Sequence, residues 1–138
     1  LRERTSLALA MIDLDHFKRL NDNHGHLVGD EVLQAVAQHL QDNLRSTDAV
    51  FRIGGEEFLL ILPDAELDEA VSRVEGLRAQ LAASPLPTRA GALSVTLSAG
   101  VALGPNHGHT LEELMQAADR ALYQAKRDGR DRVQVSQS

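Results

Sequence analysis

Apolar residues along the chain gather in short segments whose spacing alternates between the strand period and the helix period. An unbroken apolar run occupies residues 7–12 and ends at Asp13, which is typical of a strand buried on both faces. Residues 15–23 could form a short helix. Helical spacing of apolar positions after the Gly25 and Gly29 breaks predicts a further helix of about fourteen residues that begins near Asp30. Its apolar stripe must pack on a sheet.

A β-hairpin is predicted in the middle of the chain. Two strand-like segments, residues 49–53 and 58–62, flank the pair Gly54-Gly55. A Gly-Gly pair tolerates the positive φ angles of tight hairpin turns. We therefore expect Glu56 and Glu57 at or near the tip of the hairpin.

The second half of the chain continues the same alternation. The remaining predicted elements are an amphipathic helix over 67–81, a proline-containing loop over 84–87, a strand over 93–103, a helix between Thr110 and Gly129, and a short strand over 132–135. This order predicts an α+β fold, in which one mixed β-sheet carries helices on both faces.

Composition narrows the class of protein. A chain of 138 residues, 43% hydrophobic and 25% charged, suits one globular domain, and no apolar run approaches the ~20 residues of a membrane span. Cysteine is absent, which excludes disulfides and thiolate chemistry. A net charge of −6 and only one Tyr and three Phe argue against a nucleic-acid polymer as partner. Because the chain opens at Leu1 without a signal peptide, we expect a domain truncated from a longer protein.

Three carboxylates are the candidate chemistry. Asp13 follows a strand, while Glu56 and Glu57 lie at the hairpin. If these strands are neighbours, the crowded acids repel one another unless a cation neutralises them, and oxygen ligands favour Mg²⁺ or Mn²⁺. Taken singly, each residue has an alternative interpretation without a metal. Glu56 and Glu57 could be solvated turn residues, and Asp13 could be a polar residue at a strand end.

The segment Gly54-Gly-Glu-Glu-Phe58 resembles the signature of the GGDEF domains, the diguanylate cyclases, in its GGEEF form. Further segments support the resemblance in the family's order and spacing: Asp13-Leu-Asp-His-Phe-Lys18, Asn21-Asp22, Gly25-His26, Gly29-Asp30, Tyr123-Gln-Ala-Lys126 and Gly129-Arg130. The resemblance covers about residues 7–135. It implies a nucleotidyl-cyclase, palm-like fold with a mixed central sheet flanked by helices and a hairpin that carries the signature.

The resemblance also implies the reaction, the condensation of two GTP molecules into cyclic di-GMP with release of two pyrophosphates. Asp13 and Glu56 would ligate the metal through carboxylates and Leu14 through its carbonyl, with about two ions per GTP. Glu57 would assist at the metal or help to deprotonate the attacking hydroxyl. The family is Mg²⁺- or Mn²⁺-dependent by this reading.

Substrate contacts are implied at three further places. Asn21 and Asp30 resemble the guanine readers, although Asp30 could instead cap a helix. Lys126 and Arg130 would hold the β- and γ-phosphates, although cations at a helix C-terminus are common for other reasons. The remaining predicted substrate-binding residues are His16, Phe17 and Lys18.

Arg45-Ser-Thr-Asp48 resembles the RxxD site at which these enzymes bind their own product, and a surface ion pair would have the same pattern. The following helix often carries Arg where this chain has Gly76, so Arg73 or Arg78 would have to substitute.

The expected function is thus a diguanylate cyclase that acts as a homodimer with product feedback, controlled by an upstream sensory or regulatory domain. The expected location is the cytoplasm, as such or as the cytoplasmic part of a larger, membrane-bound protein. The alternative is a non-catalytic receptor of the same family that binds cyclic di-GMP or GTP.

Overall fold

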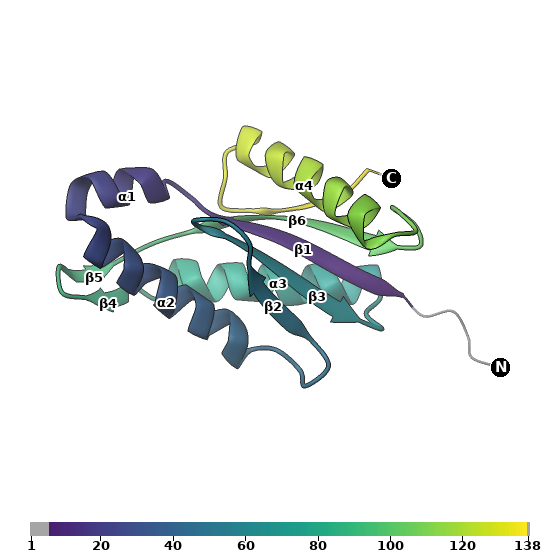
Figure 1. Ribbon diagram of the computed structural model, residues 1–138, viewed down its shortest axis with the longest axis horizontal. Coiled ribbons are helices and arrows are strands. Elements are labelled where there is room, and N and C mark those ends of the chain that lie inside the picture. The colour runs from purple at the N-terminus through teal and green to yellow at the C-terminus, as the bar shows by residue number, and fades with distance from the viewer. Residues whose placement is uncertain (1–5, 138) are drawn as a thin grey trace.

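The computed structural model describes residues 6–137, which form a five-stranded main sheet with helices on both of its faces and a separate two-stranded sheet (Figure 1). The elements in chain order are β1 (Leu7–Leu14), α1 (Phe17–His24), α2 (His26–Asp42), β2 (Ala49–Arg52), β3 (Glu57–Pro63), α3 (Leu67–Ala83), β4 (Leu86–Thr88), β5 (Gly91–Leu93), β6 (Leu97–Gly104), α4 (Leu111–Arg127) and β7 (Val133–Val135). The predicted α+β architecture is confirmed. Within the described residues, no helix is both long and apolar enough to cross a bilayer.

The main sheet has the strand order β2-β3-β1-β6-β7, with β1 at its centre. All pairings are antiparallel except the parallel pair β6 and β7. Because β1 is paired on both sides and covered on both faces, seven of its eight residues are buried, as the unbroken apolar run predicted. This central position brings the end of β1 between the hairpin and β6.

Alternation along β1 divides the core into two layers. Ala8, Ala10 and Ile12 point to one face, where they share a cluster with side chains of α2 and α3. Leu9 and Met11 point to the opposite face and pack against α4. In Figure 1, α4 accordingly lies on one side of the sheet and α2 and α3 on the other. Asp13 continues the series of odd-numbered residues and therefore faces the α4 side.

Three predicted segments had wrong boundaries. The strand expected over 93–103 is interrupted, since β5 ends at Leu93 and β6 begins at Leu97. The helix expected near Asp30 begins at His26, because Gly25 (φ 89°) ends α1 and starts α2 without a longer linker. Asp30 therefore lies inside α2 and does not cap it. The predicted loop over 84–87 instead contributes β4, which pairs with β5 in a separate two-stranded sheet. A short strand without further neighbours can include a proline, since few of its N–H groups need partners.

The hairpin turn does not use the glycine conformation that we expected. The positive-φ glycines among the described residues do not include Gly54 or Gly55. Gly54 lies close to Glu57 instead, since a Cβ there would lie 3.1 Å from Oε1 of the Glu57 side chain. Glu57 is the first residue of β3, and Glu56 precedes it in the turn.

Helix α4 approaches β6 most closely at Gly100. A Cβ at this position would lie 2.1 Å from the carbonyl oxygen of Ala118 and 2.3 Å from the backbone nitrogen of Leu122. These are backbone atoms, which cannot move aside as a flexible side chain can. The missing side chain of Gly100 thus sets the distance between the sheet and the helix that carries Lys126.

Gly100→Ala is expected to destabilise the domain by about 3 kcal/mol or more, because the added methyl group displaces α4 from the sheet. The matched control is Gly76→Ala in α3, where a Cβ meets nothing within 4 Å. That control should stabilise the domain by about 0.5–1 kcal/mol through helix propensity. Urea unfolding of both variants measures the difference, and equal stability of Gly100→Ala and wild type would contradict the close approach.

Candidate functional site

Strand pairing brings Asp13 and Glu57 to the same place. Asp13 at the end of β1 is directly opposite Glu57 in β3 and Ser98 in β6. Residues opposite one another in an antiparallel ladder point to the same face, with Cβ atoms about 4.5–5.5 Å apart. The two carboxylates predicted to converge from separate parts of the sequence therefore project together on the α4 side of the sheet.

The Asp13 side chain is buried and only half satisfied. Asp13 is 4% exposed, and Nζ of Lys126 from α4 donates to its Oδ2. Its Oδ1 is buried and has no hydrogen-bond partner. Since a buried carboxylate oxygen without a partner is costly, this atom requires a cation or a donor that is not a protein group.

Crowding perturbs both hairpin glutamates. Burial, followed by repulsion from Asp13, raises the pKa of Glu56, and Lys126 partly offsets the rise. The pKa of Glu57 is raised by the same causes in the same order, with smaller contributions from Asp119 and Glu56. The backbone N–H of Leu14 donates to the carbonyl of Glu56 at 3.3 Å, so the hairpin is held beside the end of β1.

These oxygen donors suit a hard divalent cation. Among residues 6–137, no three His, Cys, Asp or Glu side chains alone form a metal-binding group. The predicted ligand set also uses a backbone oxygen, the Leu14 carbonyl, beside the carboxylates of Asp13, Glu56 and Glu57. Mg²⁺ usually takes one or two carboxylates together with waters and substrate phosphates. The unpartnered Oδ1 of Asp13 fits such a role.

Glu57 also lines an open hollow of about 500 Å³ between the hairpin and α4. The other lining residues are Met11, Leu111, Glu112, Met115, Gln116 and Asp119. The Glu57 carboxylate therefore lies at the border of accessible space.

The two predicted guanine readers lie at the corner between α1 and α2. Oδ1 of Asn21 is buried without a hydrogen-bond partner, and a Cβ on Gly29 would lie only 1.9 Å from it. Gly29 therefore leaves room for the Asn21 amide. Asp30, the next residue of α2, is exposed. The structure thus brings an amide and a free carboxylate to one corner.

The three residues before and within α1 have different environments. His16 is exposed and adopts a left-handed conformation, φ 59°, immediately before the helix. Phe17 is buried in the core, as expected for its side chain. Lys18 is highly exposed and pairs with Asp22 at 3.2 Å on the next turn.

Arg130 lies in a turn that follows α4. The helix ends at Arg127, and Gly129 has φ 124°, as predicted for a residue just beyond a helix end. The Arg130 side chain is exposed, and its backbone N–H donates to the carbonyl of Ala125 at 2.9 Å. Lys126 in the last turn of α4 thus contacts the site at Asp13, and Arg130 follows in the turn just beyond the same helix.

Asp15 is a buried acid for which the sequence had suggested no role. It is 8% exposed and accepts hydrogen bonds from the hydroxyls of Thr96 and Ser98 and from the backbone N–H of Asp131. The available signal was a second aspartate, two residues beyond Asp13, directly after a buried strand. Arg52 was missed as well, and its guanidinium donates to the carbonyls of Gly54 and Gly55.

The predicted product site contains a closed ion-pair cluster. The Asp48 side chain is fully buried, and Arg45 and Arg73 both donate to it, Arg73 at 2.6 Å. Although burial raises the pKa of Asp48, the bonds from Arg73 and Arg45 outweigh it, and the net pKa is lowered. Arg45 also donates to the Pro63 carbonyl at 3.0 Å and to Glu69 at 3.4 Å.

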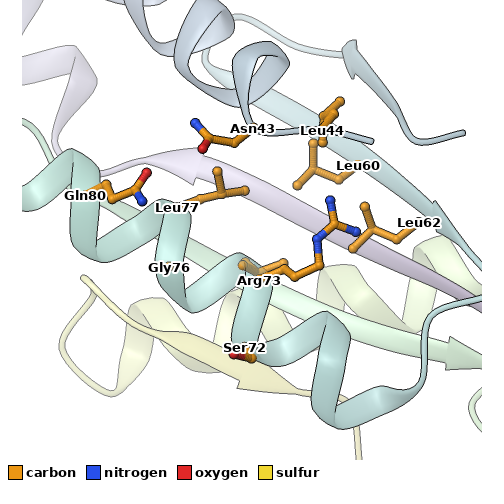
Figure 2. A pocket seen from close by; sticks show the side chains of 10 residues that line it. Asn43, Leu44, Leu60, Leu62, Ser72, Arg73, Gly76, Leu77 and Gln80 are labelled. Carbon is orange, nitrogen blue, oxygen red and sulfur yellow. The ribbon is translucent and has the colours of Figure 1, made fainter. Parts of the chain in front are cut away.

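A cavity of about 290 Å³ adjoins this cluster where the helix lacks a side chain at Gly76 (Figure 2). Figure 2 shows Arg73 extending from α3 toward Leu60 and Leu62 of β3. Arg73 therefore supplies the second arginine of the cluster from one turn earlier in α3. Arg78, the other candidate, pairs with Glu75 and Asp131 instead.

Comparison with known proteins identifies the family of the chain. The family model for the diguanylate cyclase GGDEF domain matches residues 1–132. The chain is 45% identical over 137 residues to diguanylate cyclase DgcP of Pseudomonas aeruginosa, covering 98% of this chain and 20% of DgcP. It superposes on the GGDEF domain of TpbB (YfiN) from Pseudomonas aeruginosa with a TM-score of 0.93, at 37% identity over 97% of this chain and 78% of that chain.

A second solved structure is the GGDEF domain of DgcB from Caulobacter crescentus in complex with cyclic di-GMP. Its TM-score is 0.88 at 35% identity, covering 97% of this chain and 80% of that chain. The chain belongs to the GGDEF domain family of diguanylate cyclases, which confirms the resemblance seen in the sequence. It spans about a fifth of the length of DgcP.

Glu56→Gln is expected to stabilise the metal-free domain at about pH 7. A carboxyl group whose pKa rises on folding costs stability once it is ionised, and this cost develops as the pH rises from the unfolded pKa through the folded one. The gain should therefore shrink toward about pH 4, where the unfolded glutamate also becomes protonated. Thermal unfolding in a chelator from about pH 4 to 8 measures it.

Glu66→Gln, at the exposed start of α3, removes the same charge away from the site and is the control. A Glu56→Gln domain less stable than wild type near neutral pH would contradict the crowding of the carboxylates.

Proposed function

We propose that this domain condenses two GTP molecules into cyclic di-GMP and two pyrophosphates. The observation that carries the proposal is the buried Asp13, opposite Glu57 in the sheet, paired with Lys126 and left with one unpartnered oxygen. The naming of DgcP as a diguanylate cyclase, at 45% identity, supports it. In the reaction, the ribose 3′-oxygen of each GTP attacks the α-phosphate of the other.

Asp13, Leu14 and Glu56 would hold Mg²⁺ or Mn²⁺, Leu14 through its carbonyl. When bound, a pair of such ions would neutralise phosphate charge and polarise the reacting phosphoryl group. Glu57 would accept the proton of the attacking 3′-hydroxyl or add a metal ligand. The raised pKa of Glu57 supports a basic role, since a carboxylate with a higher pKa is a stronger base.

Guanine recognition is assigned to the corner between α1 and α2. The guanine edge presents N1–H and N2–H₂ donors, and the Asp30 carboxylate can accept from them. The Asn21 amide would add a further polar contact at the same corner. Adenine lacks this pair of donors, so the corner would select GTP over ATP.

Triphosphate binding is assigned to Lys126 and Arg130, with the backbone around His16 and Phe17. Lys126 neutralises Asp13 in this structure, and a metal at Asp13 would release the ammonium group to phosphate. Lys18 would contribute from the surface of α1, where its partner is only an exposed i,i+4 aspartate.

Two such domains are needed for one product, because each holds one GTP and the product is two-fold symmetric. We infer a homodimer whose sites face each other across a two-fold axis. An upstream regulatory domain would control this pairing, and the cytoplasm remains the predicted location.

Product feedback is assigned to Arg45 and Asp48. The DgcB domain in complex with cyclic di-GMP supports binding of this ligand within the family. Since Asp48 already accepts bonds from Arg45 and Arg73, the half-exposed guanidinium of Arg45 is the group most available to a phosphate or guanine of the product.

Glu57→Ala is expected to lower the rate of cyclic di-GMP formation by about 100-fold or more, because the variant lacks the proposed base or metal ligand. Glu112→Ala, which removes a carboxylate from the same hollow, should retain activity. Chromatography of the products of GTP and Mg²⁺ measures both. Equal activity in the two variants would contradict the role of Glu57, and product binding without any turnover by wild type would indicate a receptor.

Arg45→Ala is expected to weaken cyclic di-GMP binding about tenfold or more, through loss of a charge-assisted contact. Arg89→Ala, which breaks the ion pair of Arg89 with Glu31 at 3.3 Å, is the matched control and should bind like wild type. Isothermal titration calorimetry measures both affinities. Unchanged affinity in Arg45→Ala would place the product elsewhere.

A further inference from the structure

The turn that carries Arg130 has an unusual backbone. Gly129, Arg130 and Asp131 have φ angles of 124°, 64° and 50°. Only glycine adopts positive φ routinely, and two successive L-residues there are unfavourable. Such a conformation persists only when the surrounding structure holds it in place.

Asp15 holds this turn from inside the domain. Its Oδ2 accepts from the backbone N–H of Asp131 at 3.0 Å and from Oγ1 of Thr96 at 2.7 Å. Its Oδ1 accepts from Oγ of Ser98 at 2.7 Å, and its own N–H donates to the Thr96 carbonyl at 2.9 Å. Asp15 is thus fixed to β6 and presents an anionic acceptor to the turn.

Arg78 of α3 holds the same turn from the outside. Its Nη1 donates to Oδ1 of Asp131 at 2.5 Å. The rest of the Arg78 guanidinium is aligned by Glu75, which accepts bonds at 2.9 and 2.5 Å. Asp131 is therefore held through its backbone by Asp15 and through its side chain by α3.

We propose that Asp15 and Arg78 are positioning residues for Arg130. They hold the left-handed backbone of Arg130. Its guanidinium is therefore already directed toward the triphosphate-binding position before GTP binds. The inference rests on the proposed function, because it takes Arg130 as a phosphate ligand. It predicts an effect on GTP affinity that passes through Arg130, although neither Asp15 nor Arg78 touches the substrate.

The first test compares variants by their KM for GTP and kcat. Arg78→Ala and Asp15→Ala should raise KM by about threefold to tenfold, with smaller changes in kcat. Asp15→Asn retains a carbonyl oxygen that can accept from the Asp131 N–H, so it should restore most of the affinity. Thr96→Val removes another bond to the same Asp15 oxygen and leaves the turn contact, so its KM should match wild type.

The second test uses Arg130→Ala as a background. If Asp15 and Arg78 act through Arg130, then adding Arg78→Ala to Arg130→Ala should raise KM no further. Additive effects would overturn the proposal, as would a rise in KM in Thr96→Val equal to that in Asp15→Ala. Arg78 lies outside the hydrophobic core and is partly exposed, so the result for Arg78→Ala stands if Asp15→Ala fails to fold.

A third readout separates this inference from the proposed reaction. Amide hydrogen exchange at Asp131 should be faster in Arg78→Ala and Asp15→Ala, and calorimetry should show weaker binding of GTP with Mg²⁺. If wild type forms no cyclic di-GMP, the proposed function fails. These measurements still decide whether Asp15 and Arg78 position Arg130. Unchanged amide exchange at Asp131 and unchanged GTP binding in Arg78→Ala and Asp15→Ala would overturn the positioning role of the two residues.

Discussion

The buried carboxylate of Asp13 at the end of the central strand is the constraint on which the site depends. A charge at this position is tolerated because Lys126 of α4 neutralises one oxygen, and the close contact of α4 with Gly100 brings that helix near enough. The same register places Glu57 beside it. The environment of Asp13 thus depends on strand pairing, on helix packing and on its ion pair with Lys126. Its Oδ1 has no protein partner.

The two buried aspartates Asp13 and Asp48 show how similar groups acquire different properties. Asp48 is surrounded by donors from Arg45 and Arg73, which lower its pKa and use its lone pairs. Asp13 has one cationic partner and one free oxygen. The first arrangement is closed by protein cations, whereas the second suits an exogenous cation.

Much of the fold could be predicted because its signals are local. The apolar run before Asp13 indicated a strand buried on both faces, and Thr110 was expected just before the helix that is observed as α4, where it forms a capping box with Glu113. The predicted helix boundaries were less accurate where a glycine conformation determines the end of a helix. At Gly25, for example, α2 starts about one turn earlier than expected. The hairpin was predicted at the right place, but its two glycines do not have the positive φ angles that we expected.

The sequence by itself determined the family, the order of the helices and of the main-sheet strands, and the acidic residues of the site, because these depend on residue types and their spacing. The tertiary structure alone decided which groups satisfy one another. Asp15 holds Asp131 across 116 residues of chain, and Arg73 reaches Asp48 from α3. Such partnerships depend on strand order, register and the distance between layers, since hydrogen bonds require separations of about 3 Å that no local pattern encodes.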